Sequence, residues 1–189
     1  MAGATVQWLR DNLNLITQAS ETEAIAQSVT DTGGCYFVPA FSGLFAPYWR
    51  SDARGVIVGL TRYVNRAHIV RAALEAICYQ TREVLEAMNA DSGVPLRTLK
   101  VDGGATTNHF LMQFTADLNN AELRVATMSD CSPLGAVLAG MLGMKVYDSL
   151  EALAALPQAD VVYQPAMPTQ QAWHFYDGWQ RAVRQTLCE

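Results

Sequence analysis

The order of strand-like and helix-like segments between Gly55 and Leu142 is the feature that most limits how this chain can fold. Short runs rich in β-branched residues alternate with longer segments in which apolar residues recur at helical spacing. The expected strands are Gly55–Leu60, Leu96–Val101 and Glu122–Ala126. The helices expected to follow them, in the same order, are Asn65–Ala90, Thr107–Leu118 and Ser132–Leu142. This alternation predicts an α/β layer architecture with parallel strands joined by right-handed crossovers.

The long segment Asn65–Ala90 is expected to be the central amphipathic helix, with Asn65 as its N-cap. Its apolar residues gather on one side, and most of its charged residues gather on the other. The apolar set is Val70, Leu74, Ile77, Val84 and Met88, and the charged set is Arg71, Glu75, Arg82, Glu83 and Glu86. The helix from Ser132 is rich in Gly and Ala, which permits close packing against another helix or a sheet.

Further elements are expected on both sides of this alternating region. A helical pattern over Ala2–Leu15 begins without an N-cap signal, which indicates a chain cut within a larger protein. The other expected elements are a helix at Glu21–Val29, a strand at Cys35–Val38, an aromatic loop at Pro39–Gly55, a helix at Leu150–Ala155, an extended piece at Val161–Tyr163 and a helix from Thr169. We divide the chain into a main lobe, residues 1–148, and a helical extension packed on it, residues 149–189.

Composition argues against several functional classes. The 189 residues are 50% hydrophobic and 16% charged, which is enough apolar material for one sizeable core. A net charge of -5 from scattered acidic residues, without a basic run, argues against nucleic-acid or membrane-surface partners. The longest apolar stretch, Pro133–Met144, is shorter than the roughly 20 residues of a bilayer span. The four cysteines lie far apart without metal-ligand spacing, so we expect a reducing, cytoplasmic location.

The segment Val101–Asn108 carries the most informative local pattern. An expected strand ends in Asp102-Gly103-Gly104 and leads into a helix, which places backbone N–H groups and a helix N-terminus where a nucleotide can approach. Glycine matters there because a side chain would hold the ligand away. The spacing matches neither a Walker loop nor a Gly-x-Gly-x-x-Gly fingerprint, so a simple tight turn remains the alternative. Asn108 correspondingly either contacts the base of a nucleotide or is simply a polar residue at the start of a helix.

Gly3 and Gln7 form a second possible ligand position. They lie four residues apart on the first expected helix and therefore share one face, with little bulk beside the glutamine amide. The alternative is close helix packing with an exposed glutamine. Spacing alone assigns no residue as a catalytic group or a metal ligand.

Two runs resemble the signature pair of the FGGY carbohydrate kinases. The first is GVIVGLTRYVNRAHIVRAALE from Gly55, and the second is VDGGATTNHFLMQFTADL from Val101, followed by SPLGAVLAG from Ser132. Within that family, AGATVQWLRDNL, VPAFSGLFAPYW, ARGVIVGLTR and YQTREVLEAM are most similar to the glycerol kinases. The resemblance extends over nearly the whole chain.

The resemblance implies a function and a set of site residues. It implies the C-terminal, nucleotide-side lobe of an actin-like, ribonuclease-H-like α/β fold, incomplete at its N-terminal edge. It also implies transfer of the γ-phosphoryl group from ATP, as its Mg²⁺ complex, to a terminal hydroxyl of glycerol. Gly3, Gln7, Gly104 and Asn108 fall on positions that contact ATP or ADP in the family.

The resemblance also implies what this chain lacks. The family's catalytic aspartate, phosphate turn and glycerol-binding residues all precede the segment that matches Met1. We therefore expect no catalytic residue here, no activity in isolation, glycerol binding only with an N-terminal lobe, and a homo-oligomeric full-length relative. Three alternatives stay open: a split enzyme, another polyol or sugar kinase of the family, and a non-catalytic nucleotide-binding module.

Overall fold

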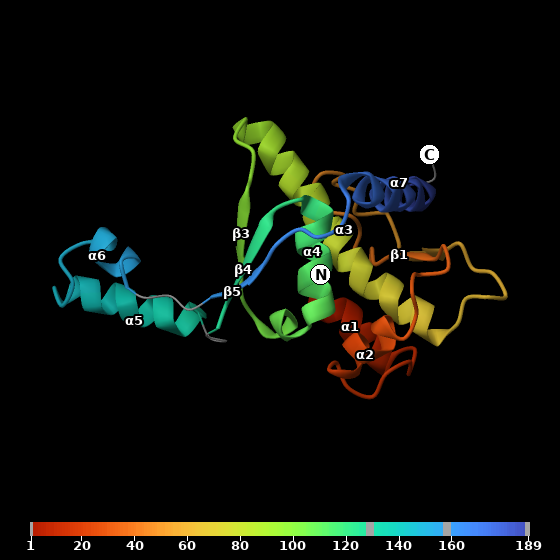
Figure 1. Ribbon diagram of the computed structural model, residues 1–189, viewed down its shortest axis with the longest axis horizontal. Coiled ribbons are helices and arrows are strands. Elements are labelled where there is room, and N and C mark those ends of the chain that lie inside the picture. Colours follow the sequence, from red (N-terminus) through yellow and green to blue (C-terminus); the bar gives the residue numbers. More distant parts are fainter. Residues whose placement is uncertain (1, 128–130, 157–159, 188–189) are drawn as a thin grey trace.

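A long central helix, α3 (Arg66–Ser92), organises the fold in a computed structural model that describes residues 2–127, 131–156 and 160–187 (Figure 1). The predicted cap is confirmed, since the Asn65 side chain accepts hydrogen bonds from the N–H groups of Ala67 and His68. The helix ends at Gly93, whose φ of 67° is in the left-handed region that glycine adopts easily. The helices α1 (Ala2–Asp11), α2 (Glu21–Gln27) and α4 (His109–Asn119) pack along α3.

Two small sheets lie on opposite sides of the α3 and α4 helices (Figure 1). Strands β1 (Tyr36–Val38) and β2 (Val56–Val58) form an antiparallel pair. In the other sheet, β3 (Thr98–Val101) runs parallel to β4 (Glu122–Ala126), and β5 (Asp160–Tyr163) pairs antiparallel with β4. The short helical turn η1 (Gly104–Thr107) connects β3 to α4.

The prediction of one parallel sheet is therefore right for β3 and β4 but wrong for the strand at Gly55–Leu60. The segment between Pro39 and Gly55 turns the chain back, so β2 pairs with the strand before it. Because α3 packs against β1 and separates it from β3, the two strand pairs cannot join. The alternation of segment types was correct, but it does not specify which strands are neighbours.

The main core joins α3, α4 and the terminal helix α7 (Thr169–Thr186) through stacked aromatic rings. Tyr79 and Trp179 stack with ring centroids 5.2 Å apart, and Phe114 meets Tyr79 edge-on. The terminal helix also packs against β1, and β5 adds a strand to the sheet. Within residues 149–189, β5 and α7 thus contribute to the same sheet and core, while the boundary after residue 148 stays a prediction.

The charged side of α3 is buried in part, which the amphipathic pattern did not reveal. Glu75, Arg82 and Glu83 are all buried, whereas Val84 and Met88 are exposed. Arg82 is sandwiched between the rings of Trp173 and Tyr176 on α7, 4.1 Å from each centroid. Other elements pack over this side and supply partners for Arg82 and Glu83, whereas Glu75 is paired within α3 by Arg71 and Tyr79.

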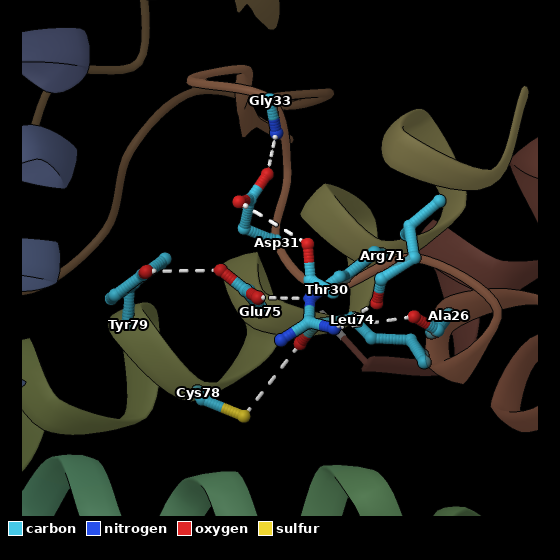
Figure 2. A network of polar contacts seen from close by, with 10 residues as sticks. Ala26, Thr30, Asp31, Gly33, Arg71, Leu74, Glu75, Cys78 and Tyr79 are labelled. Atoms are coloured by element: carbon cyan, nitrogen blue, oxygen red, sulfur yellow. Dashed lines mark hydrogen bonds and ion pairs between the residues drawn. The ribbon is translucent and has the colours of Figure 1, made fainter. Parts of the chain in front are cut away.

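Arg71 fixes α2 against α3, as Figure 2 shows. Its Nη1 donates to the carbonyl oxygens of Val29, 2.6 Å away, and Ala26, 3.3 Å away, at the C-terminal end of α2. Its Nε pairs with Glu75 at 2.8 Å, and the Tyr79 hydroxyl donates to the same carboxylate at 3.1 Å (Figure 2). Burial raises the pKa of Glu75, which Arg71 and Tyr79 oppose. This network sets the position of α2.

Helices α5 (Cys131–Gly143) and α6 (Leu150–Ala154) project away from the rest of the molecule (Figure 1). No described residue of α5 is buried, and a Cβ at Gly135 or Gly140 would meet no atom within 4 Å. The close packing that we expected from these small residues is therefore not present in the described part of the chain. No helix among the described residues has the length and apolarity needed to cross a membrane.

Candidate functional site

A cleft of about 800 Å³ opens between α1, α2 and the turn after β3. Leu74 and Ile77 of α3 form an apolar part of its wall. All four residues predicted for nucleotide binding line this one cleft: Gly3, Gln7, Gly104 and Asn108. Two segments about a hundred residues apart in the sequence are thus brought to the same space. That these residues contact a nucleotide stays a prediction.

The turn at Gly103 and Gly104 is held by short local hydrogen bonds. The hydroxyls of Thr106 and Thr107 donate to the carbonyl oxygens of Gly103 and Gly104, at 2.7 and 2.9 Å. Gly103 has a φ of 100°, so its backbone conformation favours glycine. Gly104 is different, because its φ lies outside the left-handed region and a Cβ there would meet no atom within 4 Å. Only an occupant of the cleft would be obstructed by a side chain at position 104.

Gly3 and Gln7 present the opposite wall from α1. Both are exposed and lie one helical turn apart, as the sequence predicted. A Cβ at Gly3 would also meet no atom within 4 Å, so packing within the chain does not require glycine there. None of the described residues packs closely against Gly3, as the alternative of close helix packing would require. The Gln7 amide is placed to donate or accept a hydrogen bond in the cleft.

The start of α4 is not bare, unlike the helix N-terminus that we predicted. Helix α4 begins at His109, and two of its first N–H groups already have acceptors. The Asn108 Oδ1 atom accepts from Leu111 at 2.9 Å, and a Glu23 carboxylate oxygen accepts from Phe110 at 3.2 Å. A carboxylate at this helix end disfavours a phosphate there, because the two negative charges repel. This end of the cleft therefore suits an uncharged part of a ligand.

Asn108 combines the two roles that the sequence left open. It caps α4 through Oδ1, and its Nδ2 donates to the Thr22 hydroxyl of α2 at 3.2 Å. The side chain is half-buried and still lines the cleft. A structural role at the helix start and a ligand contact are thus compatible.

Sequence reasoning missed several further residues of the cleft, among them Arg10, Thr22 and Glu23. Arg10 follows Gln7 by three residues on α1, so helical periodicity could have found it. Its guanidinium pairs with Asp11 at 2.6 Å, which raises the pKa of Arg10 and lowers the pKa of Asp11. Thr22 and Glu23 have no such signal, because only the folded chain brings α2 to the start of α4. Among the described residues, no group of three or more His, Cys, Asp or Glu side chains could hold a metal ion.

Comparison with known protein sequences gives a consistent result. Residues 1–144 match the FGGY family of carbohydrate kinases, C-terminal domain. Glycerol kinase of Saccharopolyspora erythraea is 53% identical over 187 residues, which are 99% of this chain and 37% of that protein. Glycerol kinase of Chloroflexus aurantiacus is also 53% identical over 187 residues, covering 99% of this chain and 38% of its own length.

Solved structures show the same relation in the fold. The structure of Plasmodium falciparum glycerol kinase with ADP has a TM-score of 0.89 and 40% identity, covering 98% of this chain and 37% of that one. Xylulose kinase from Lactobacillus acidophilus, with a TM-score of 0.81 and 22% identity, shares the fold. The expected α/β kinase fold is thereby confirmed. This chain spans little more than a third of the length of these relatives.

Proposed function

This chain belongs to the FGGY family of carbohydrate kinases, and on that premise we propose that it supplies the nucleotide-binding side of an ATP-dependent glycerol kinase. The cleft is the observation that carries this proposal. It gathers Gly3, Gln7, Gly104 and Asn108, the positions that the resemblance assigns to ATP or ADP, from two distant segments. The relative of known structure with a TM-score of 0.89 was solved with ADP, which supports the same ligand class.

The chemistry of the cleft suits the adenosine part of the nucleotide. The wall offers apolar surface at Leu74 and Ile77, unobstructed backbone at Gly104, and amide groups at Gln7 and Asn108. Flat apolar ring systems and hydrogen-bonding edges match such a surface. The Glu23 carboxylate at the start of α4 favours placing the phosphates away from that end.

The contribution of this chain to phosphoryl transfer would be positioning. Phosphoryl transfer depends mainly on the alignment of both substrates and on charge stabilisation. A part that holds ATP aligns only one of the two substrates. ATP would arrive as its Mg²⁺ complex, and the general base and the glycerol contacts would come from the N-terminal lobe. We therefore expect the isolated 189-residue chain to bind nucleotide but not to phosphorylate glycerol.

We place this kinase in the cytoplasm, and we infer that the full-length relative is a homo-oligomer. Among the described cysteines, Cys35 and Cys78 are buried free thiols. Burial raises the pKa of Cys35 to about 11 and the pKa of Cys78 to about 12, so both stay protonated near neutral pH. Such thiols are compatible with a reducing compartment.

Isothermal titration of the purified chain with ADP tests the proposal. The same titration is repeated with Mg²⁺-ATP after addition of the separately produced N-terminal part of Saccharopolyspora erythraea glycerol kinase. We expect saturable binding by the chain alone and phosphorylation of glycerol only in the mixture. A folded chain that binds no adenine nucleotide, alone or in the mixture, would contradict the proposal.

The outcome also separates the remaining alternatives. A panel of polyols and sugars in the reconstituted assay distinguishes glycerol from another substrate of the family. Nucleotide binding without phosphorylation of any substrate in a verified complex would favour a non-catalytic nucleotide-binding module.

A further inference from the structure

Thr22 and Asn108 form a contact across the cleft wall that no local sequence pattern encodes. Thr22 lies in α2, is 2% exposed, and accepts a hydrogen bond from Asn108 Nδ2 at 3.2 Å. The same Thr22 hydroxyl donates its only hydrogen to the carbonyl oxygen of Ala19 at 2.7 Å. Towards Asn108, therefore, the Thr22 oxygen can act only as an acceptor.

This arrangement determines the orientation of the Asn108 amide. In the observed orientation, Oδ1 accepts from the Leu111 N–H at 2.9 Å while Nδ2 donates to Thr22. Rotating the amide by half a turn would place Nδ2 against the Leu111 N–H, which is also a donor. It would also place Oδ1 against a Thr22 oxygen that has no hydrogen left to give. Both hydrogen bonds would be lost, so one orientation is selected.

We propose that Thr22 is a positioning residue that holds Asn108 Nδ2 ready to donate its second hydrogen to an acceptor atom of the bound nucleotide. This inference rests on the proposed function, and it names the atom through which Asn108 acts. The acceptor is a ring nitrogen or an oxygen of the ligand, because Nδ2 can only donate. Neither Thr22 nor its contact with Asn108 was suggested by the positions that the family resemblance identified.

Four variants and ADP as the probe test this role. Thr22→Val keeps the shape of the side chain but removes the hydroxyl, and Thr22→Ser keeps the hydroxyl. One hydrogen bond corresponds to about a 2- to 12-fold change in affinity, so Thr22→Val should weaken ADP binding within that range, while Thr22→Ser should stay near the unchanged chain. Asn108→Ala should weaken binding as well, and adding Thr22→Val to it should cause no further loss.

The double variant distinguishes positioning from a general structural effect. An equal loss from Thr22→Val with and without the Asn108 side chain would overturn the proposal, as would unchanged ADP affinity in folded Thr22→Val. Circular dichroism of each variant establishes that it is folded, and Thr22→Ser remains informative if Thr22→Val does not fold.

A readout without nucleotide separates failure of this inference from failure of the proposed function. The two Asn108 side-chain amide protons can be observed by NMR in the free chain, with Asn108→Ala used for assignment. Thr22→Val should shift these signals and speed their exchange with water, whereas Thr22→Ser should largely preserve them. Unchanged signals would refute the fixed orientation. Absence of ADP binding by the unchanged chain would refute the proposed function, and with it the role towards a nucleotide.

Discussion

Glu83 is a carboxylate buried at the centre of a three-element contact, and its charge works against folding. It is 4% exposed and accepts hydrogen bonds from the Tyr48 hydroxyl at 2.5 Å and from Trp179 Nε1 at 2.8 Å. Burial raises the pKa of Glu83, and the two hydrogen bonds only partly oppose this effect. A carboxyl group with a raised folded-state pKa stabilises the fold below its unfolded pKa. That stabilising contribution is lost as pH rises through the pKa that the carboxyl group has in the folded state.

Replacement of Glu83 should therefore depend on whether an acceptor is kept. Glu83→Gln retains an oxygen for Tyr48 and Trp179 and removes the charge, so at pH 7 it should be at least as stable as the unchanged chain. Glu83→Ala leaves two buried donors without an acceptor and should cost roughly 2–5 kcal/mol. Urea unfolding between pH 4 and pH 8 provides the measurement, and Glu83→Gln should lose less stability as pH rises. If Glu83→Gln instead lost more stability than the unchanged chain as pH rises, the buried charge of Glu83 would not be the cause of the pH dependence.

Gly104 allows ligand approach to be tested without disturbing the fold. Gly104→Val places atoms only in the open cleft, so the melting temperature should change little while ADP affinity falls at least about tenfold, or 1.4 kcal/mol. Gly178→Ala is the matched control, because its Cβ would lie 2.0 Å from the Tyr36 hydroxyl oxygen within the core contact of α7. That variant should lower stability and leave the cleft intact. Titration with ADP and thermal unfolding should therefore show lost affinity with an unchanged melting temperature for Gly104→Val, and a lowered melting temperature with the cleft intact for Gly178→Ala.

Arg71 makes a large contribution to the attachment of helix α2. Arg71 supplies donors to carbonyl oxygens of Ala26 and Val29 and neutralises buried Glu75. Arg71→Met should cost roughly 3–5 kcal/mol in urea unfolding, because it leaves an uncompensated buried charge. Adding Glu75→Gln should recover much of that loss. Hydrogen exchange should also show α2 opening more readily in Arg71→Met, and unaltered protection of α2 would rule out this attachment.

At the level of elements, local signals predicted well what local chemistry determines. Asn65 was identified as a cap because its side chain acts within its own helix, and β3 and β4 were found from their composition. The pairing of β2 and the burial of Glu75, Arg82 and Glu83 depend on which distant elements pack there, and helical periodicity carries no such information. Arg82 and Glu83 of α3 are buried with partners on other elements, and Glu75 is buried with partners on α3 itself.

The site shows the same division. The Gly104–Asn108 segment was visible as a pattern, and the family resemblance joined it to Gly3 and Gln7. Thr22 and Glu23 reach the same wall because α2 packs against α3, where Arg71 helps to hold it, and against the start of α4. The place of these two residues in the cleft wall is a consequence of tertiary structure, so residue spacing in the sequence could not have predicted it.

At the scale of the whole molecule, α5 is an apolar helix without cover. From Cys131 to Gly143 it contains no charged residue, none of its described residues is buried, and Val137 is 58% exposed. A helix that is apolar all round normally lies inside a protein. Since the chain spans little more than a third of its relatives' length, the remaining part of the kinase is the cover that we propose.

The isolated chain should therefore bind a hydrophobic dye and associate as its concentration rises, since contiguous exposed apolar surface drives both. Val137→Lys places a charge on α5 and should reduce dye fluorescence and self-association in analytical ultracentrifugation. The melting temperature should hardly change, because Val137 is not part of the core. Gln170→Lys, at an exposed position on α7, adds the same charge away from α5 and should alter neither property.

Addition of the N-terminal part of a glycerol kinase should suppress dye binding to the unchanged chain. A monomeric chain that binds no dye would show that α5 is covered by its own protein in solution.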